Sequence, residues 1–515
     1  MASSDDKKVA DLYKNPVVKL PHINELKEID AELRLKSSDE EIEFVHEHLK
    51  DVIKAYQRVN ELIEPQLPVK YPRTPGFKAD DDAWYWKCEV KGASTGKLAG
   101  KTIGIKDNVA VAGVPMMNGS KILEGYTPEF DATIITRILD EGGIIAGKTV
   151  CEDMCFSGNS WTSSSGPVKN PFNNRLSAGG SSSGSAALLA RKEIDLAIGG
   201  DQGGSIRIPS SWCGTVGLKP TFGLVPYTGI ASIETTIDHT GPMARTVKDC
   251  ALLLEVIAGY DEGRDPRQIP NVEIPSYSKL VDDGVKGLKI GLVKEGFSFK
   301  QMEEDVAKLV RESATKLTGA GATVEDTSIP IHDDGLEIWT PAAFEGTYKC
   351  MVQGNGAGYH WKGHYPTSMQ EAHARGFATR PHDMSFALKL VVIIAEYISK
   401  NYQNKFYAKS LNLTNVLTMA YDEALKKYDV LIMPTLPMKP LPLPTEKDDL
   451  HEIIRLTFDM IKNTAPFDST GHPALSINAG FSEGLPVGMM IIGKKFDEAT
   501  VLKVARAFEK IRDGK

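Results

Sequence analysis

Two glycine- and serine-rich clusters in the run 177–221 constrain the fold of this chain more than any other feature. The first cluster, 179–184, reads GGSSSG, the second, 203–205, reads GGS, and an apolar segment at 196–198 lies between them. Glycine lets a backbone direct several N–H groups at one point, and a serine beside such a nest can act as a nucleophile whose oxyanion those groups stabilise. Such composition more often marks a linker. Because these clusters stand between apolar segments, we expect buried, shaped loops.

From residue 98 onward the chain alternates between strand-like and helix-like patterns. Strand-like segments lie at 98–107, 144–147, 196–198, 288–293, 430–433 and 487–493, and amphipathic helical segments lie at 131–141, 246–259, 304–319 and 499–511. Strands that alternate with helices are typical of an α/β fold. We therefore predict a mixed, largely parallel central sheet flanked by helices.

A chain of 515 residues is too long for one simple core, so we expect several parts. These are a helical N-terminal segment (1–80), a core (81–329), a helical insertion that shapes a pocket (330–425) and a C-terminal part of the core (426–515). In the first part, Ser38 and Glu41 fit a capping box, and an apolar stripe at helical spacing follows them. This stripe predicts a helix that packs on another domain or on a second subunit.

Composition excludes several classes of function. The chain is 41% hydrophobic and 25% charged, with a formal net charge of −8, so no basic surface for nucleic acid is indicated. Its longest strongly apolar run, 390–395, is too short to cross a membrane, and the N-terminus has no apolar signal segment. The six cysteines are irregularly spaced and do not complete a metal site. We expect a soluble cytoplasmic protein that acts on a small molecule without metal or cofactor.

Three arrangements of serine can be compared. In the nucleophile elbow G-x-S-x-G, which 180–184 matches with Ser182 at its centre, a strand comes immediately before the motif, but a polar, proline-containing loop precedes this one. An S-x-x-K motif begins at Ser313, inside a charged helical segment without its companion motifs. The third arrangement joins Lys106, at the end of a predicted strand, to a serine of the first cluster and to Ser205.

The third arrangement is chemically coherent. An alcohol needs a base to become a nucleophile at neutral pH, and a lysine can serve as that base when burial favours its neutral amine. A second hydroxyl can relay the proton because it both donates and accepts. A strand-terminal lysine is more often a solvated surface residue. The glycines before Ser205 would supply an oxyanion hole, so this arrangement predicts acyl transfer.

The chain resembles a known family. The run GGSSSGSAALLA at 179–190, followed by GGDQGGSIRIPSSWCGTVGLKPT at 199–221, is similar to the motifs of the amidase signature family, and IKD at 105–107 is similar to its lysine motif. The sequence intervals from Lys106 to Ser181 and from Ser181 to Ser205 also agree with those that are usual for this family. The resemblance covers 99–259 and returns at 429–435 and in the C-terminal strand and helix.

The resemblance implies a Ser–cis-Ser–Lys triad. Ser205 would be the acylated nucleophile, Ser181 the bridging serine and Lys106 the base. The family's oxyanion hole corresponds to the backbone N–H groups of Gln202, Gly203, Gly204 and Ser205, and its acyl-pocket wall corresponds to Cys155, Phe156 and Ser157. We interpret Asp201 and Arg207 as an ion pair that supports this loop, and Ser182 and Ser183 as side chains that bond to the backbone.

Gln202 and the segments 221–227 and 238–242 resemble amidases that act on small aliphatic and aromatic amides, among whose relatives carbamate hydrolysis occurs. The resemblance also implies that the helical N-terminal segment supports a homo-oligomer. An alternative within the family is the glutamyl-tRNA amidotransferase A-type subunit, which normally has Thr at the position of Gln202. An alternative from another class is a catalytically silent binding module.

Aromatic residues are candidates for shaping the substrate pocket. Trp212 replaces a smaller residue of the family pattern, and we expect it to reshape the acyl pocket. Within the insertion at 330–425, Trp339, Tyr359 and Trp361 are candidates by composition alone.

Overall fold

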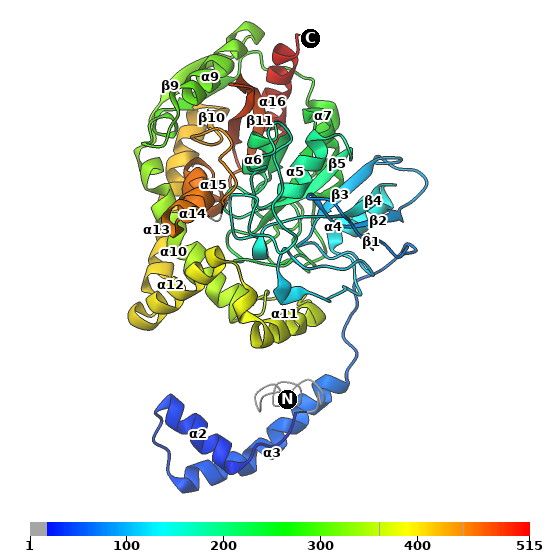
Figure 1. Cartoon of the computed structure of the whole chain (residues 1–515), viewed down its shortest axis with the longest axis vertical. Helices are drawn as coiled ribbons and strands as arrows, with labels where there is room; N and C mark the ends of the chain where they lie inside the picture. The colour runs from blue at the N-terminus through cyan, green and yellow to red at the C-terminus, as the bar shows by residue number, and fades with distance from the viewer. Residues whose placement is uncertain (1–17, 360, 446, 515) are drawn as a thin grey trace. The chain divides into compact units, whose positions relative to one another are not determined.

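The computed structural model describes residues 18–359, 361–445 and 447–514. Residues 1–17, the first part of the predicted N-terminal segment, lie outside the described residues. The chain divides into two compact units, one that ends at Leu67 and one from Pro68 to Lys515, and each is described by itself (Figure 1). The four-part division predicted from the sequence stays a prediction.

The first unit consists of two helices, α2 (Ile23–Leu33) and α3 (Asp39–Glu61). The capping box is present, because Glu41 N–H donates to Ser38 Oγ at 3.2 Å and Ser38 N–H donates to Glu41 Oε2 at 2.7 Å. Two apolar residues of α3 are buried, Ile42 and Ile53. Leu49 is partly buried, and the other large apolar side chains on this helix are exposed by a third or more: Phe44, Val45, Val52, Tyr56 and Val59.

Within the described residues, the second unit holds one 12-stranded sheet in the order β1-β2-β4-β3-β5-β7-β6-β11-β12-β10-β8-β9. The strands are β1 (Phe77–Lys78), β2 (Trp84–Lys91), β3 (Thr102–Lys106), β4 (Ile144–Thr149), β5 (Leu196–Asp201), β6 (Val216–Lys219), β7 (His239–Ala244), β8 (Lys289–Val293), β9 (Thr323–Thr327), β10 (Val430–Pro434), β11 (Ala474–Ser482) and β12 (Leu485–Gly493).

The sheet is mixed, as predicted, but it is not largely parallel, because seven of the eleven neighbouring pairs of described strands are antiparallel. β3 runs parallel to β4 and β5, and β8 runs parallel to β9 and β10. The other neighbours are antiparallel, including β6, β7 and β11 in the middle of the sheet, which the sequence pattern did not predict. β6 and β7 escape the pattern because they are short and carry glycine or proline, which are depleted in strands.

Helices cover both faces of the sheet. Successive side chains of a strand point to opposite faces, and in β10 Ile432 belongs to a core that includes residues of α4, α7, α9 and α16, whereas Leu431 belongs to one that includes residues of α13 and α15. The helices named so far in this unit are α4 (Thr133–Asp140), α7 (Val247–Ile257), α9 (Glu304–Thr315), α13 (Lys405–Lys427), α15 (Ala465–Thr470) and α16 (Glu498–Arg512). The remaining ones are α5 (Ser183–Ala190), α6 (Arg207–Trp212), α8 (Tyr277–Leu280), α10 (Gly335–Thr347), α11 (Thr367–Thr379), α12 (Phe386–Tyr402) and α14 (Leu450–Phe458).

The predicted insertion at 330–425 holds α10, α11, α12 and most of α13, with only helical elements among its described residues. Figure 1 shows α10, α12 and α13 on the same side of the core as α14 and α15, whereas α11 lies apart from this group. α10 packs against α13 and α15. The insertion therefore adjoins the C-terminal helices that complete the pocket described next.

Candidate active site

The three residues of the predicted triad lie where neighbouring parallel strands end. Lys106 is the last residue of β3, and Ser205 lies in the loop after β5, whose Ile198 pairs with Ile105 of β3. Ser181 lies just before α5, which contacts both strands. Loops at the carboxyl ends of parallel strands form the crevices in which α/β proteins bind ligands. The sheet topology thus brings together three segments that are distant in the chain.

Lys106 and Ser181 form a buried hydrogen bond. Lys106 Nζ donates to Ser181 Oγ at 2.8 Å and to the Gly200 carbonyl at 3.2 Å. Both side chains are fully buried, and the Gly180-Ser181 peptide bond is cis. The neighbouring carboxylate, Asp107, instead pairs with Lys148 at 3.0 Å. The lysine amine is therefore directed at a serine hydroxyl.

The loop that carries Ser205 is held by a buried ion pair. Arg207 donates from Nε to Asp201 Oδ2 and from Nη2 to Asp201 Oδ1, each at 2.9 Å, and Nη2 also donates to Asp468 Oδ2 at 2.7 Å. Burial by itself would raise the pKa of Asp201, but the charge of Arg207 outweighs it and holds that pKa well below its usual range. These contacts have the geometry expected for the supporting role predicted for Asp201 and Arg207.

One N–H of the expected oxyanion hole is engaged within the loop. Gly204 N–H donates to Asp201 Oδ1 at 2.6 Å, so it does not point at a substrate. The Gly203 carbonyl accepts a hydrogen bond from Thr464 Oγ1 at 2.6 Å, which orients the peptide between the two glycines. The N–H groups of Gln202, Gly203 and Ser205 remain candidates for the oxyanion hole.

The other serines of the first cluster bond to backbone, as the sequence predicted. Ser182 Oγ donates to the Gly200 carbonyl at 3.2 Å, and Ser183 Oγ donates to the Val150 carbonyl at 3.3 Å. Ser182 is therefore turned toward the backbone of β5, which disfavours the nucleophile-elbow arrangement. Ser313, from the S-x-x-K motif, is buried and donates to the Ala479 carbonyl at 3.1 Å.

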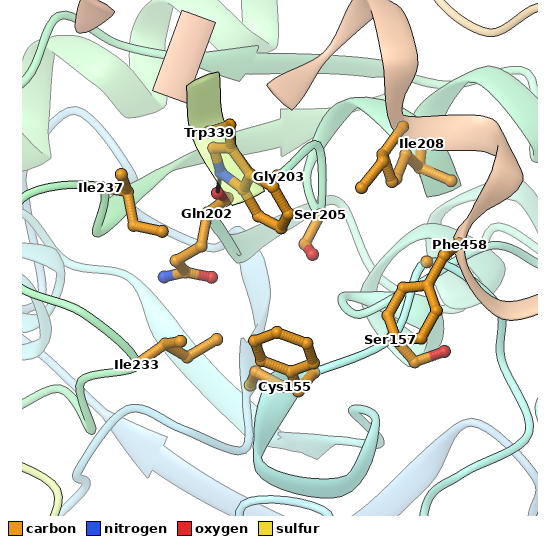
Figure 2. Close-up of a pocket in the computed structure, with 13 residues that line it drawn as sticks. Cys155, Ser157, Gln202, Gly203, Ser205, Ile208, Ile233, Ile237, Trp339 and Phe458 are labelled. Carbon is orange, nitrogen blue, oxygen red and sulfur yellow. Dashed lines mark hydrogen bonds between the residues drawn. The ribbon is translucent and has the colours of Figure 1, made fainter. Parts of the chain in front are cut away.

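Ser205 lies on a pocket of about 400 Å³, a volume that includes the part open to solvent. Figure 2 shows its hydroxyl directed into this space. The lining residues are Cys155, Phe156, Ser157, Gly158, Gln202, Gly203, Ser205, Ile208, Ile233, Ile237, Trp339, Phe458 and Ile461. Among these described residues none has a charged side chain. The predicted wall residues Cys155, Phe156 and Ser157 all line the pocket.

Much of the pocket wall was not predicted from the sequence. Ile233, Ile237, Phe458 and Ile461 lie outside the motifs, and an isolated apolar residue carries no signal for a pocket. Trp339 on α10, a candidate by composition, does line the pocket, and its Nε1 donates to the Gln202 carbonyl at 2.8 Å (Figure 2). The insertion therefore contributes directly to the site.

Other aromatic residues lie elsewhere. Trp212 was expected to reshape the acyl pocket, but it is fully buried behind the loop and donates from Nε1 to the Met438 carbonyl at 3.2 Å. It is not among the pocket-lining residues, so this expectation was wrong. Trp361 lines a neighbouring cavity, and Tyr359 is 64% exposed.

Gln202 has one partnered and one unpartnered end. Its Nε2 donates to the Tyr227 hydroxyl at 2.9 Å, whereas its Oε1 is buried and has no hydrogen-bond partner among the described residues. Figure 2 shows that the side-chain oxygen of Gln202 points into the pocket, toward the same space as the Ser205 hydroxyl. A buried acceptor without a partner is costly. Its position in the pocket makes it available to a donor on a ligand.

Comparisons with known proteins agree with this geometry. The sequence matches the family model described as Amidase over residues 69–502. The chain is 46% identical over 458 residues to an enantioselective amidase from Rhodococcus rhodochrous, with 88% of each chain covered. It is 38% identical to the A-type subunit of the glutamyl-tRNA(Gln) amidotransferase from Methanosarcina mazei, over 81% of this chain and 86% of the relative. The crystal structure of a bacterial aryl acylamidase of the amidase signature family matches with a TM-score of 0.67 and 27% identity, over 81% of this chain and 83% of that one.

The mixed sheet brings a buried lysine–serine pair close to a serine-bearing loop and a pocket. This arrangement is typical of a hydrolase that works by acyl transfer. This chain belongs to the amidase family, and it is an amide-hydrolysing enzyme. The family and the fold class predicted from the sequence are thereby confirmed, and the amidotransferase is the weaker match. Within the part of the chain that the structure describes, no helix is long and apolar enough to cross a membrane.

Proposed function

We propose that this enzyme hydrolyses primary amides of small apolar carboxylic acids through an acyl-enzyme on Ser205. One observation carries the proposal: the Ser205 hydroxyl points into an uncharged, largely apolar pocket. The Ser205 carbonyl accepts from the N–H of Ser182 at 3.2 Å, and Ser182 follows the Ser181 that is hydrogen-bonded to Lys106. An apolar wall excludes water around the acyl group, which strengthens the electrostatic interactions that stabilise a transition state.

Each residue has a role in the proposed cycle. Ser205 Oγ attacks the amide carbon, and its proton passes through Ser181 Oγ to Lys106 Nζ. The N–H groups of Gln202, Gly203 and Ser205 stabilise the oxyanion. The same relay returns the proton to the leaving nitrogen, the C–N bond breaks and ammonia departs. Water then attacks the ester, and its hydrolysis regenerates Ser205 and releases the acid.

The pocket chemistry narrows the substrate class. Glutamine, the ammonia donor that an amidotransferase would use, carries an ammonium and a carboxylate group, and a buried charge needs a partner. None of the described residues that line the pocket is charged. Three aromatic side chains, Phe156, Trp339 and Phe458, suit an aliphatic or aromatic acyl group instead. A carbamate ester presents the same carbonyl and N–H groups as an amide, so we extend the proposal to small carbamates.

We also propose that the enzyme is a cytoplasmic homo-oligomer. The exposed apolar side chains of α3 form a stripe suited to a second copy of this chain. All six cysteines are free, as is usual in the reducing cytoplasm. The described residues that line the catalytic pocket all belong to the second unit.

Fluorophosphonate labelling tests the proposed nucleophile. Cleavage by trypsin after Lys192 and Arg207 yields a peptide, 193–207, in which Ser205 is the single serine. We expect the label on this peptide, and Ser205→Ala should lower kcat for benzamide by about 10³-fold or more. Ser183→Ala, a matched change in the other cluster, should keep both label and turnover.

The outcomes separate the hypotheses. Label on the peptide 176–191, which holds Ser181 and Ser182, would overturn the assignment of Ser205 as nucleophile. A protein that takes no label and turns over neither benzamide, acetamide nor ethyl carbamate would match the silent binding module. Turnover of benzamide without turnover of ethyl carbamate would restrict the substrates to amides.

A further inference from the structure

Tyr227 is held rigidly behind Gln202. Its backbone N–H donates to Asp265 Oδ2 at 2.8 Å, and the guanidinium of Arg267 lies 4.7 Å from the centre of its ring. Arg267 is in turn paired with Asp265 at 2.7 Å. The tyrosine is 6% exposed and lines a second cavity of about 410 Å³. Both its backbone and its ring are therefore fixed.

The hydroxyl of Tyr227 has a defined direction of donation. It donates to the Ala231 carbonyl at 3.2 Å. A phenol has one proton, so a hydroxyl that donates to this carbonyl can only accept from Gln202. Burial, together with the charge of Asp238, raises the pKa of Tyr227 well above its usual value, so the proton stays on the hydroxyl.

This direction decides which end of the Gln202 carboxamide faces the substrate. Because the hydroxyl accepts, Nε2 is the end that turns toward Tyr227, at 2.9 Å, and Oε1 is the end that turns into the pocket. The backbone of Gln202 cannot easily rotate to change this, since its carbonyl accepts from Trp339 Nε1 at 2.8 Å. The pocket thus presents a fixed hydrogen-bond acceptor close to Ser205.

We propose that Tyr227 is a positioning residue that, through Gln202, makes this site prefer amides over esters. The inference rests on the proposed function. The nitrogen of a primary amide carries hydrogens that can donate to Gln202 Oε1, and it keeps donors as the C–N bond breaks. The alkoxy oxygen of an ester has only lone pairs to present to the same atom, so the contact is repulsive. The substrate N–H would also satisfy the unpartnered Oε1.

The test compares benzamide with methyl benzoate, which form the same benzoyl-enzyme, so that their kcat/KM values differ only in acylation. Tyr227→Phe keeps the ring and removes the hydroxyl, which frees the carboxamide to rotate. We expect kcat/KM for benzamide to fall by about 10-fold and that for methyl benzoate to stay within about 2-fold of wild type or to rise. The amide-to-ester ratio should therefore fall by at least about 10-fold.

Tyr126→Phe is the matched control. Tyr126 is also 6% exposed, and its hydroxyl bonds to Ser368 Oγ at 3.1 Å, outside both cavities described above. It should leave the amide-to-ester ratio unchanged. In a Gln202→Met background, Tyr227→Phe should no longer alter the ratio, because the two residues act through one hydrogen bond.

Two results would overturn the inference: an equal fall for amide and ester in Tyr227→Phe, or a change of the ratio that persists in the Gln202→Met background. Either would leave the proposed function intact, provided that the wild-type enzyme hydrolyses benzamide. A wild-type enzyme that hydrolyses neither compound would instead contradict the proposed function itself.

Discussion

At the scale of single residues, the loop before Ser205 depends on a glycine at position 204. Gly204 has φ +134°, which residues with a side chain rarely adopt, and a Cβ there would lie 2.4 Å from Thr464 Oγ1. That hydroxyl orients the Gly203 carbonyl. A side chain at 204 would therefore strain the backbone and displace the group that positions the neighbouring peptide.

We expect Gly204→Ala to lower the free energy of unfolding by about 2 kcal/mol or more and to reduce kcat by at least about 10-fold. Gly284→Ala is the control for strain alone, because Gly284 has φ +81° with open space around its Cβ position. It should cost about 1 kcal/mol and leave kcat unchanged. Urea denaturation and benzamide turnover measure both effects. Wild-type turnover in Gly204→Ala would show that the loop tolerates a side chain there.

At this scale, the predictions for catalytic residues rest on local motifs. Lys106, Ser181 and Ser205 stand in recognisable motifs, and the structure brings these segments to adjoining strand ends. The role of Gly204 differs from the expectation, because its N–H bonds to Asp201. The roles of Thr464 and Asp468 were not predictable, since both act across more than 250 positions of sequence.

At the scale of elements, the segment after β4 contains a buried carboxyl group beside the triad. Glu152 Oε2 accepts hydrogen bonds from Trp161 N–H at 3.1 Å and from Thr162 N–H at 2.9 Å, and Glu152 N–H donates to the Ser181 carbonyl at 3.3 Å. Burial raises the pKa of Glu152 to about 7, although these hydrogen bonds oppose the shift. Glu152 thus carries a titratable side chain, and its backbone N–H bonds to the backbone of the bridging serine, Ser181.

The raised pKa predicts a pH-dependent stability. The folded state holds a proton on Glu152 up to about pH 7, whereas the carboxyl in an unfolded chain loses it near its ordinary value of 4.5. The stabilising contribution is therefore complete below pH 4.5 and is lost as the pH rises through about 7. The loss is at most about 3 kcal/mol.

Glu152→Gln cannot titrate and should remove this slope. Its Tm should change less than that of wild type between about pH 5 and about pH 8 at constant ionic strength. Glu47→Gln, on the exposed surface of α3, should keep the wild-type slope. If the Tm of Glu152→Gln followed the wild-type curve throughout, the proton on Glu152 would not contribute to the pH dependence.

At the scale of the whole molecule, the first unit leaves much of its apolar stripe uncovered. Tyr56 and Val59 on α3 are 61% and 69% exposed. Within the described residues, α2 and α3 bury only Ile42 and Ile53 of their own side chains. Helices with so little internal burial gain most of their stability from packing on another surface.

We therefore expect a double variant, Tyr56→Glu with Val59→Glu, to shift the full-length enzyme from an oligomer to a monomer. Sedimentation velocity measures the mass, and kcat/KM per chain should stay within about 2-fold of wild type because the described residues that line the pocket all belong to the second unit. Lys54→Glu, a charge change on the same helix, should leave the mass unaltered. An unchanged mass in the double variant would locate the interface elsewhere.

The local features of this protein follow from its sequence. Strand and helix periodicity, the capping box at Ser38 and the glycine–serine clusters are set by neighbouring residues, so 304–319 was correctly predicted as helical and 430–433 as a strand. Motif resemblance supplied the family, and the roles of the triad residues stay proposals. These features depend on interactions that a short segment makes with itself.

The way in which distant segments meet depends on the tertiary structure. It inserted the antiparallel strands β6, β7 and β11 between the parallel groups, removed Trp212 from the pocket, and placed Trp339 of the insertion against Gln202. It also set Tyr227 behind Gln202, which fixes the end of the carboxamide that faces the substrate. Such pairings depend on sheet register and side-chain packing across long sequence separations, and no local pattern encodes them.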